Sequence, residues 1–515
     1  MTGAENLVQA LLDAGIEVCF TNPGTSEMHF LTAINTIKKM RPILTLFEGV
    51  ATGAADGYAR MADKPACTLL HLGPGLGNGI ANLHNARKAR SPMVNIVGDH
   101  ATYHKSNETP LRSDVESIAR PISHWVRTSY HPDVIAWDGA EAAAEAKKAP
   151  GHIATLILPA DVSWSESKSQ PPKMSLVQRP PRVAPEKIRD LASILSSGER
   201  AFILMSGKAL RQKGLQAAAR IAAKVKAELY CDTFISRLER GAGAAKINRL
   251  PYFAEQSSKR FEGIQHLILV ESSRPESFFA YPNKPTRLIP GDCQVHILAT
   301  PEEDSIQALC DLAEKMGVSH GDYPTYTPFR PELPTGELNP MSVAATIGAL
   351  MPENAIVCDE SGTSGGGLMK LTGGAPKHDW LNMTGGSIGQ ALPLSVGAAV
   401  ACPDRKVICL SGDGGAMYTI QSLWTQAREN LDVVNVIFAN RAYAILTQEL
   451  KRVGVENGIE FIDPLFQLDH PKLDFCQLAN GMGVKAFRAT TADEFNVHFK
   501  NGVNTKGPML IEVVL

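Results

Sequence analysis

The feature that most constrains this chain is a glycine-rich stretch between two apolar runs near its C-terminal end. Residues 406–411 are mostly apolar and β-branched and stop at residues 412–415, Gly-Asp-Gly-Gly, a pattern typical of a strand that enters a tight turn. Apolar residues at helical spacing follow over residues 417–427, and a second apolar run, 433–438, ends just before Asn440. The stretch therefore predicts one β-α-β unit.

Asp413 and Asn440 are predicted to lie close together. Parallel strands joined by a right-handed crossover end at the same edge of a sheet, where open α/β sheets bind ligands. One carboxylate and one amide oxygen, beside backbone amides that Gly414 and Gly415 leave accessible, suit a hard cation such as Mg²⁺ that keeps diphosphate oxygens among its ligands. Because short glycine patterns are common, Asp413 taken alone fits a simple helix cap equally well.

Composition sets the class of protein. A chain of 515 residues is expected to form about three domains, and a net charge of -2 gives no reason to expect a nucleic-acid or acidic-membrane partner. The sequence has no apolar segment of transmembrane length and opens without a basic leader. Its nine cysteines include no CxxC pair, so we expect reduced thiols and a cytoplasmic protein.

Alternating strand and helix patterns predict an α/β fold of three doubly wound domains with parallel sheets. We expect the first domain at residues 1–165, the second at 185–322 and the third at 341–515, with proline-rich connectors between them. The predicted strands are Glu17–Phe20, Ile43–Phe47, Ala66–His71, Met93–Val97, Ala201–Met205, His266–Glu271, Ala355–Cys358, Lys406–Leu410, Val433–Phe438 and Met509–Val514.

Glu48 is a candidate catalytic residue in the first domain. It ends an apolar strand and opens a helix whose small residues, from Gly49 to Ala55, permit close approach by another backbone. A carboxylate in that place would be largely removed from water and suited to proton exchange. From these residues alone, a first-turn glutamate favoured by the helix dipole is the simpler interpretation.

Two more glycine-rich segments, 22–27 and 71–78, follow predicted strands and are interpreted as turns on the same edge as Glu48. The second segment fails the spacing of a dinucleotide fingerprint, because Asn78 and Ile80 stand where its third glycine is needed. This disfavours a nicotinamide-dependent dehydrogenase. His71 opens the segment, and a single histidine after a strand is more often a core residue than a catalytic one.

These motifs together resemble a known family. Gly-Asp-Gly followed at this distance by Asn440 resembles the thiamine diphosphate motif of the family that contains acetolactate synthase, pyruvate decarboxylase and benzoylformate decarboxylase. Residues 55–60, Ala-Asp-Gly-Tyr-Ala-Arg, match a second motif of that family letter for letter. The resemblance covers essentially the whole chain and implies a pyrimidine-binding first domain, a middle domain and a diphosphate-binding third domain.

The resemblance assigns the metal ligands. It implies that Mg²⁺ is held by Asp413, Asn440 and the backbone carbonyl of Ala442, and that the ion carries the diphosphate of thiamine diphosphate. Ala439 and Ala444 depart from the residues usual in the family, but neither departure removes a ligand.

The resemblance also assigns catalytic, cofactor and substrate contacts. Glu48 is implied to hold N1′ of the cofactor aminopyrimidine, and His71 matches the active-site histidine of benzoylformate decarboxylase, which implies a proton relay. His100 and His104 are weaker candidates that we expect on a solvated loop. The remaining expected cofactor contacts are Pro23, Asn78, Thr363, Gly386, Ile388, Gly414 and Gly415, and the expected substrate contacts are Thr25, His71, Leu446 and Glu449.

The implied activity is a non-oxidative decarboxylase or carboligase, a lyase similar to benzoylformate decarboxylase that acts on a 2-oxo acid. An acetolactate synthase-type transferase that condenses two 2-oxo acids stays open, as does a non-catalytic regulatory homologue that binds the cofactor. The site is expected between two subunits of a homodimer or a dimer of dimers, with Glu48 from one copy and Asp413 from the other. In relatives the middle domain can bind FAD or an adenine nucleotide or act only as a spacer, and FAD stays possible here without being supported. Gly207, Lys208 and Arg211 follow a predicted strand and could meet a phosphate, but a helix start with solvated charges is the simpler interpretation.

Overall fold

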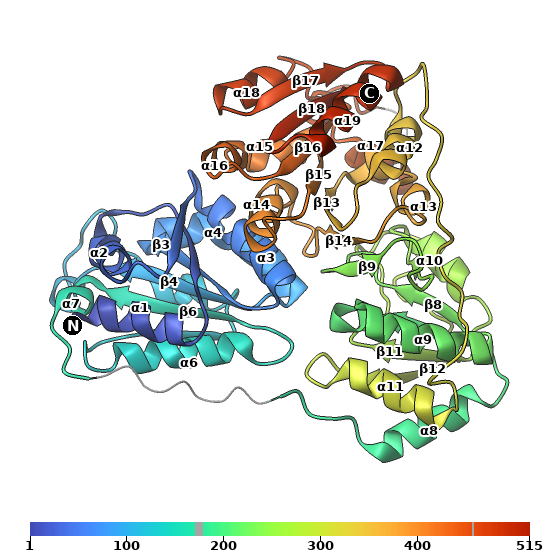
Figure 1. Cartoon of the computed structure of the whole chain (residues 1–515), viewed down its shortest axis with the longest axis horizontal. Coiled ribbons are helices and arrows are strands. Elements are labelled where there is room, and N and C mark those ends of the chain that lie inside the picture. Colours follow the sequence, from blue (N-terminus) through green and yellow to red (C-terminus); the bar gives the residue numbers. More distant parts are fainter. Residues whose placement is uncertain (170–178, 456–457) are drawn as a thin grey trace.

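The computed structural model describes residues 1–169, 179–455 and 458–515. Three sheets follow one another along the chain, and each has helices on both faces (Figure 1). The prediction of an α/β fold with three doubly wound, mainly parallel sheets is therefore confirmed. Within the described ranges, no helix combines the length and the apolar character needed to cross a membrane.

The first sheet has six parallel strands in the order β2-β1-β3-β4-β6-β5. The chain moves outward from β1 to β2 and returns on the other side of β1 as β3, so the order reverses between β1 and β3. Such a reversal opens a crevice at the carboxyl ends of the two strands. The strands are β1 (Val18–Thr21), β2 (Arg41–Leu44), β3 (Ala66–His71), β4 (Met93–Asp99), β5 (Trp125–Thr128) and β6 (Ile153–Pro159). The helices are α1 (Gly3–Asp13), η1 (Thr25–Glu27), α2 (Met28–Ile37), α3 (Glu48–Ala62), α4 (Leu72–Ala89), η2 (Thr102–His104), α5 (Val115–Ala119), α6 (Ile135–Lys147) and α7 (Ala160–Trp164).

The third sheet repeats this strand order. Its six parallel strands run β14-β13-β15-β16-β18-β17, the order reverses between β13 and β15, and β9 (Leu238–Arg240) adds antiparallel to the β14 edge. The first and third sheets therefore share one topology, as internal copies would. The strands are β13 (Ala355–Glu360), β14 (His378–Asn382), β15 (Val407–Gly412), β16 (Val433–Ala439), β17 (Lys485–Ala489) and β18 (Met509–Val514). The helices are α12 (Pro340–Leu350), η4 (Gly362–Gly365), α13 (Leu368–Leu371), α14 (Ala391–Ala401), α15 (Asp413–Tyr418), α16 (Ser422–Arg428), α17 (Ala444–Arg452), η5 (Asp463–Phe466), α18 (Phe475–Gly481) and α19 (Ala492–Asn504).

The middle sheet is smaller, with five parallel strands in the order β10-β8-β7-β11-β12 and a reversal between β7 and β11. An extended connector then returns the chain from α11 to α12 along the outside of the molecule (Figure 1). The strands are β7 (Ala201–Met205), β8 (Glu228–Cys231), β10 (Asn248–Arg249), β11 (His266–Val270) and β12 (Gln294–Ala299). The helices are α8 (Pro185–Leu195), η3 (Gly207–Leu210), α9 (Gln212–Val225), α10 (Ala254–Phe261) and α11 (Ser305–Lys315).

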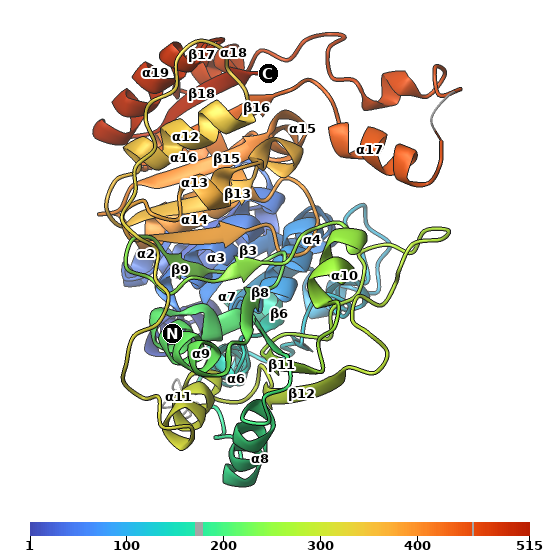
Figure 2. The same ribbon diagram turned by 90° about the vertical axis from the view of Figure 1, so that its right-hand side faces the viewer.

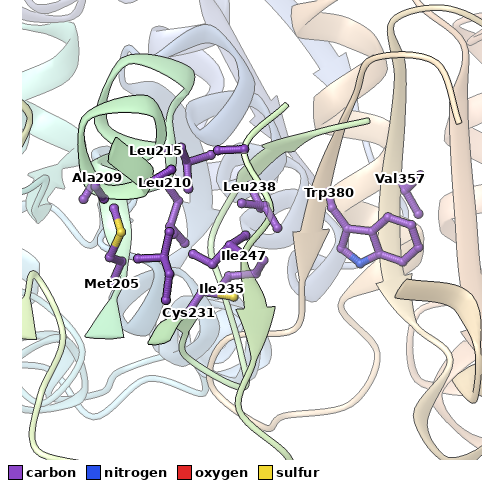
Figure 3. Close-up of a cluster of buried hydrophobic side chains, with 14 of the residues drawn as sticks. Met205, Ala209, Leu210, Leu215, Cys231, Ile235, Leu238, Ile247, Val357 and Trp380 are labelled. Atoms are coloured by element: carbon purple, nitrogen blue, oxygen red, sulfur yellow. The ribbon is translucent and has the colours of Figure 1, made fainter. Parts of the chain in front are cut away.

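Two of the apolar cores join neighbouring sheets, while two smaller cores lie within the first and the middle sheet alone. One continuous core contains residues of the first and third sheets, and another contains residues of the middle and third sheets. In the second of these, Leu238 of β9 lies between the middle-sheet side chains and Trp380 of β14 (Figure 3). Burial across all three sheets favours a fixed arrangement of the sheets in one chain.

Helices α3 and α14 pack with their backbones in close approach. Each follows the second strand of its sheet in chain order, so the two helices hold equivalent positions in the repeated topology. A Cβ atom added to Gly57 would lie 2.1 Å from the carbonyl oxygen of Leu394, and one added to Gly397 would lie 1.8 Å from that of Ala54. The small residues that follow Glu48 in α3 thus pack against a face of small residues on α14.

A buried ion pair reinforces the same contact. Arg60 donates to Asp56 with two nitrogens, at 2.8 and 2.6 Å, and both side chains are almost fully buried. Arg60 also donates to the carbonyl oxygen of Asn382 at 2.7 Å, while the Gln390 amide donates to Asp56 at 2.6 Å. Within one chain, the residues that match the family motif at 55–60 therefore tie the first sheet to the third. Buried charges hold a geometry of this kind only when they are paired and hydrogen-bonded.

Three local predictions were wrong. Residues 72–78 and 413–415, predicted to be glycine turns, form the first turns of α4 and α15. In α4 the glycines serve close packing, since a Cβ on Gly79 would lie 2.9 Å from Thr52. The helix predicted over 417–427 is interrupted between α15 and α16. Of the proline-rich connector predicted between the first and second domains, residues 170–178 lie outside the described part of the chain.

We predict that Gly57→Ala lowers the free energy of unfolding by about 1–3 kcal/mol, because the added methyl group overpacks a contact with backbone that has no flexible side chain to move. Thermal and urea unfolding of the purified protein measure this. Gly481→Ala in α18 is the matched control, since a Cβ there has no neighbour within 4 Å. Equal stability of both variants and the wild type would show that α3 and α14 do not pack as described.

Candidate active site

Glu48 lies at the crevice where the first sheet reverses its strand order. It opens α3 and is 6% exposed. Asn78, at the start of α4, donates to its carboxylate at 3.0 Å, and Asn22, directly after β1, donates at 3.5 Å. Pro23 follows Asn22 and is half-buried. Three segments distant in sequence therefore meet at one carboxylate, whose hydrogen-bond partners are side-chain amides.

His71 ends β3 on the same edge and rests on a carboxylate that sequence reasoning missed. Its Nδ1 lies 3.1 Å from both carboxylate oxygens of Glu27 and 3.1 Å from the Ser26 hydroxyl. Glu27 is 1% exposed and also accepts a hydrogen bond from the Gly24 amide at 2.7 Å. A buried carboxylate on Nδ1 fixes the ring orientation and directs the other ring nitrogen away from it. Glu27 is the last residue of the segment 22–27, and no pattern in the sequence indicates that its side chain turns inward.

A cavity of about 310 Å³ opens in front of His71. His100 and His104, which were expected on a solvated loop, line this cavity and lie at the edge that holds His71. Their rings stand 5.7 Å apart between centroids, and His100 pairs with the Thr109 hydroxyl at 3.2 Å. The lining includes Thr25, Ser26, His71, His100, Tyr103, His104 and Trp164.

Asp413, Asn440 and Ala442 come together at the carboxyl edge of the third sheet. Asp413 is 3% exposed, and its carboxylate accepts hydrogen bonds from the amides of Gly414 at 2.8 Å and Arg441 at 2.6 Å. The side-chain oxygen of Asn440 accepts from the Ala442 amide at 3.2 Å. Burial raises the pKa of the Asp413 carboxyl, although the two backbone amides oppose the shift.

This donor set fits Mg²⁺ with a diphosphate. A carboxylate, an amide oxygen and a backbone carbonyl on one edge are hard oxygen ligands. Arg441 has a left-handed backbone, with φ of 57°, which turns residues 440–442 back toward Asp413. Thr363 stands exposed in η4, on the same edge after β13.

Gly386 and Ile388 lie on the segment between β14 and α14, which rests on α4 of the same chain. The Asn85 amide donates to the carbonyl of Ser387 at 2.8 Å, and His84 pairs with the carbonyl of Gly385 at 3.0 Å. Gly386 is exposed with φ of 77°, and Ile388 is half-buried.

Glu360 is a second carboxylate that sequence reasoning missed. It ends β13 and accepts three backbone hydrogen bonds, at 2.5, 2.8 and 2.7 Å, from the amides of residues 389–391 at the start of α14. A Cβ on Gly415 would lie 2.8 Å from one of its oxygens, so Glu360 supports the turn beside Asp413. Burial raises the pKa of Glu360 to about 7, against the effect of the three amides.

Leu446 and Glu449 lie on α17, which projects from the body of the molecule (Figure 2). Leu446 is 42% exposed. Glu449 pairs with Arg452 at 2.8 Å, and Arg452 also pairs with Glu255 of α10 at 2.8 Å. The Glu449 carboxylate is therefore engaged in docking α17 on the middle part of the chain.

Two groups of side chains thus form, one around Glu48 and His71 and one around Asp413 and Asn440. Among the described residues, no hydrogen bond or ion pair joins the first group to the second. Each group lies at a strand-order reversal of its own sheet. Together the two groups contain the predicted catalytic residues and the predicted metal ligands.

Comparison with known proteins agrees with this arrangement. The model described as "Thiamine pyrophosphate enzyme, N-terminal TPP binding domain" matches residues 1–118, and the corresponding C-terminal TPP binding domain matches residues 360–513. A Mycobacterium tuberculosis protein named "Putative acetolactate synthase large subunit IlvX" is 51% identical over 519 residues, covering 100% of this chain and 99% of that protein. Benzoylformate decarboxylase of Pseudomonas aeruginosa is 27% identical, covering 97% of this chain and 96% of that enzyme.

A solved structure has the same fold. The thiamine diphosphate-dependent 4-hydroxybenzoylformate decarboxylase of Rhodococcus jostii RHA1 superposes with a TM-score of 0.87 at 23% identity, covering 99% of this chain and 98% of that one. The fold and the two groups of side chains therefore define a thiamine diphosphate-binding α/β protein. This chain belongs to the thiamine pyrophosphate enzyme family, and within it to the enzymes of decarboxylase or acetolactate synthase-like carboligase type.

The raised pKa of Glu360 predicts a pH dependence of stability. Its ordinary value is 4.5 and its value in the fold is about 7, so the protonated carboxyl is the favoured form in the folded protein. Its contribution is fully present below pH 4.5 and is lost as the pH rises to 7, by up to about 3 kcal/mol.

Urea unfolding of the cofactor-free protein at pH 5 and pH 8 measures this difference. Glu360→Gln, which cannot ionise, should reduce the part of the pH dependence that falls between these values. The same decline from pH 5 to pH 8 in Glu360→Gln and wild type would assign the effect to other groups.

Proposed function

We propose that this chain is a thiamine diphosphate- and Mg²⁺-dependent decarboxylase of a 2-oxo acid that releases carbon dioxide and an aldehyde. The observation that carries the proposal is the His71–Glu27 pair at the cavity on the edge that holds Glu48. A decarboxylase has to add a proton to the carbon that loses carbon dioxide, and an oriented imidazole is suited to that step. When bound, the cofactor supplies the electron sink that makes loss of carbon dioxide feasible.

Glu48 is assigned the proton exchange at N1′ of the aminopyrimidine. Its low exposure keeps water from competing for this contact, and Asn22 and Asn78 hold the carboxylate by side-chain amides. The two amides bind different oxygens of the carboxylate, and no cation pairs with it among the described residues, so an oxygen lone pair is left for the ring nitrogen. Gly386 and Ile388 are assigned to the same aminopyrimidine from the third sheet.

His71 is assigned the proton transfer to the carbon that becomes the aldehyde. Glu27 binds Nδ1, so Nε2 is the nitrogen free to face the cavity. Thr25, also at the cavity, is assigned a hydrogen bond to the substrate carboxylate, and Leu446 a contact with the substrate side chain.

Asp413, Asn440 and the carbonyl of Ala442 are assigned to Mg²⁺, and Gly414, Gly415 and Thr363 to the diphosphate. Because the Glu48 group and the Asp413 group lie on separate sheet edges, we propose that two copies of the chain pair so that each active site takes one group from each copy. A homodimer is the smallest active unit in this proposal, and a dimer of dimers is compatible with it.

Acetolactate synthase-type carboligation is the second candidate, and the 51% identical relative with that printed name supports it. Both reactions begin with loss of carbon dioxide from a 2-oxo acid. They differ in whether the reacting carbon takes a proton or joins a second carbonyl. Analysis of the products after incubation with a panel of 2-oxo acids distinguishes an aldehyde from a 2-hydroxy-3-oxo acid.

We predict that Glu48→Gln lowers the rate of carbon dioxide release by about 10²–10⁴-fold, because the amide cannot exchange a proton with N1′. The assay uses protein supplied with thiamine diphosphate and Mg²⁺. Cofactor retention after gel filtration should change little, since the diphosphate contacts are intact. Glu17→Gln is the control, because that carboxylate is exposed and pairs with Lys64.

Full activity of Glu48→Gln would overturn the assigned mechanism. A wild-type protein that retains the cofactor but releases no carbon dioxide from any 2-oxo acid would instead favour a regulatory cofactor-binding role.

The shared site predicts complementation between two inactive variants. Glu48→Gln and Asp413→Ala copies carrying different tags are co-expressed, and the mixed dimer is isolated. One of its two sites carries both changes, and the other carries neither. We expect about half the wild-type activity per dimer, whereas each variant alone is nearly inactive and Asp413→Ala loses Mg²⁺ and cofactor. A mixed dimer without activity would place each active site within a single chain.

A further inference from the structure

A second cavity, of about 260 Å³, lies between the first and middle parts of the chain, away from the groups described above. Its walls come from the end of α3, the segments 89–92 and 147–151, and the residues that follow β7 and β11. The cavity thus lies at the strand-order reversal of the middle sheet, between β7 and β11, and open α/β sheets bind ligands at such positions.

The lining of this cavity is strongly cationic. Seven of its side chains are arginine or lysine, against the two carboxylates of Asp63 and Glu271. Asp63 is shared, because Arg211 approaches it to 3.0 Å and Arg237 to 3.4 Å. Lys208 is exposed at the cavity. Arg60, Lys64 and Arg237 pair with Asp56, Glu17 and Asp379, which lie outside the lining. Within the described part of the chain Lys208 has no ion-pair partner, so it and Arg211 are the cations left to attract an anion into this partly enclosed space.

Arg211 carries an unused donor at this cavity. Its Nη1 is buried without a hydrogen-bond partner, while Nη2 binds Asp63. Burial and the neighbouring charge of Arg237 lower the pKa of Arg211. A buried unpaired donor on a charged group is costly, and an oxyanion would satisfy it.

The backbone amides that could hold a dinucleotide phosphate here are already occupied. Glu271 accepts hydrogen bonds from the amides of Lys208 and Ala209, each at 3.1 Å, and its carboxylate also binds the Ser305 hydroxyl. A Cβ on Gly207 would lie 1.9 Å from a Glu271 oxygen, so the carboxylate fills the turn after β7. The residues present do not fit FAD, since an internal carboxylate takes the place of a phosphate and the volume lies below the roughly 300–1,000 Å³ usual for larger ligands.

We propose that this cavity binds a small oxyanion, a phosphate ion or the phosphate group of a small metabolite, through Arg211 and Lys208 and not through the amides after β7. The ion would join the first and middle parts of the chain, since Asp63, at the end of α3, already pairs with Arg211. None of the residues assigned to catalysis belongs to this site, so the proposal of anion binding does not depend on the proposed function.

The test uses protein saturated with thiamine diphosphate and Mg²⁺, so that the diphosphate site is filled. Inorganic phosphate, glycerol 3-phosphate and FAD are titrated separately by calorimetry, with thermal unfolding as a second readout. One phosphate ion is expected to bind per chain and to raise the unfolding temperature. Arg211→Gln should weaken phosphate binding at least tenfold. Lys208→Gln, at an exposed position, should weaken it as well and guards against a folding defect in the first variant.

Arg189→Gln is the matched control, since Arg189 lies on α8 and pairs at the surface with Glu186. Its phosphate affinity should equal that of the wild type. Binding of glycerol 3-phosphate that also depends on Arg211 would identify an organic phosphate as a source. Equal phosphate affinity in wild type, Arg211→Gln and Lys208→Gln would overturn the proposal, as would stoichiometric FAD binding that displaces phosphate.

Discussion

The close backbone packing of α3 on α14 is the contact on which the rest of the structure depends. It requires glycine at Gly57 and Gly397 and leaves one orientation for the two helices. Because α3 begins with Glu48 and Glu360 caps the start of α14, the same contact fixes two buried carboxylates. Glu360 is saturated by backbone amides, whereas Glu48 is held by the side chains of two asparagines. One carboxylate therefore serves the fold, and the other is left for a ligand.

The shared strand order of the first and third sheets explains how the chain divides its chemistry. β3 and β4 hold the positions in the first sheet that β15 and β16 hold in the third. The first pair of strands ends at His71 and just before His100, while the second pair is followed by Asp413 and Asn440. Equivalent strand ends thus carry imidazoles in one sheet and a carboxylate and an amide in the other. A site that needs both must combine two edges, which is the physical argument for the proposed pairing of two copies.

Much of the fold follows from local patterns, since the strands at 66–71 and 509–514 have the predicted bounds. The contact between Asp413 and the segment after β16 also follows, because parallel strands must end together. The prediction of glycine turns was wrong because a glycine in the sequence indicates backbone freedom, whereas here the glycines make room for a neighbouring segment that the local sequence does not reveal. Glu27 was missed for a similar reason: its partner His71 lies 44 residues away, and a polar segment looks the same whether its carboxylate is exposed or buried.

Apart from Glu48, each sheet has a buried glutamate at its strand-order reversal: Glu27 in the first, Glu271 in the middle and Glu360 in the third. All three accept backbone amides, so each replaces the anion that such a crevice attracts. In the first sheet the glutamate contacts His71, and in the third sheet it packs against the turn at Gly415. In the middle sheet the glutamate fills the turn itself, and the cationic side chains stand beside it. A buried glutamate therefore supports each of the two edges proposed to form the active site, and in the middle sheet it occupies the turn where a dinucleotide phosphate would bind.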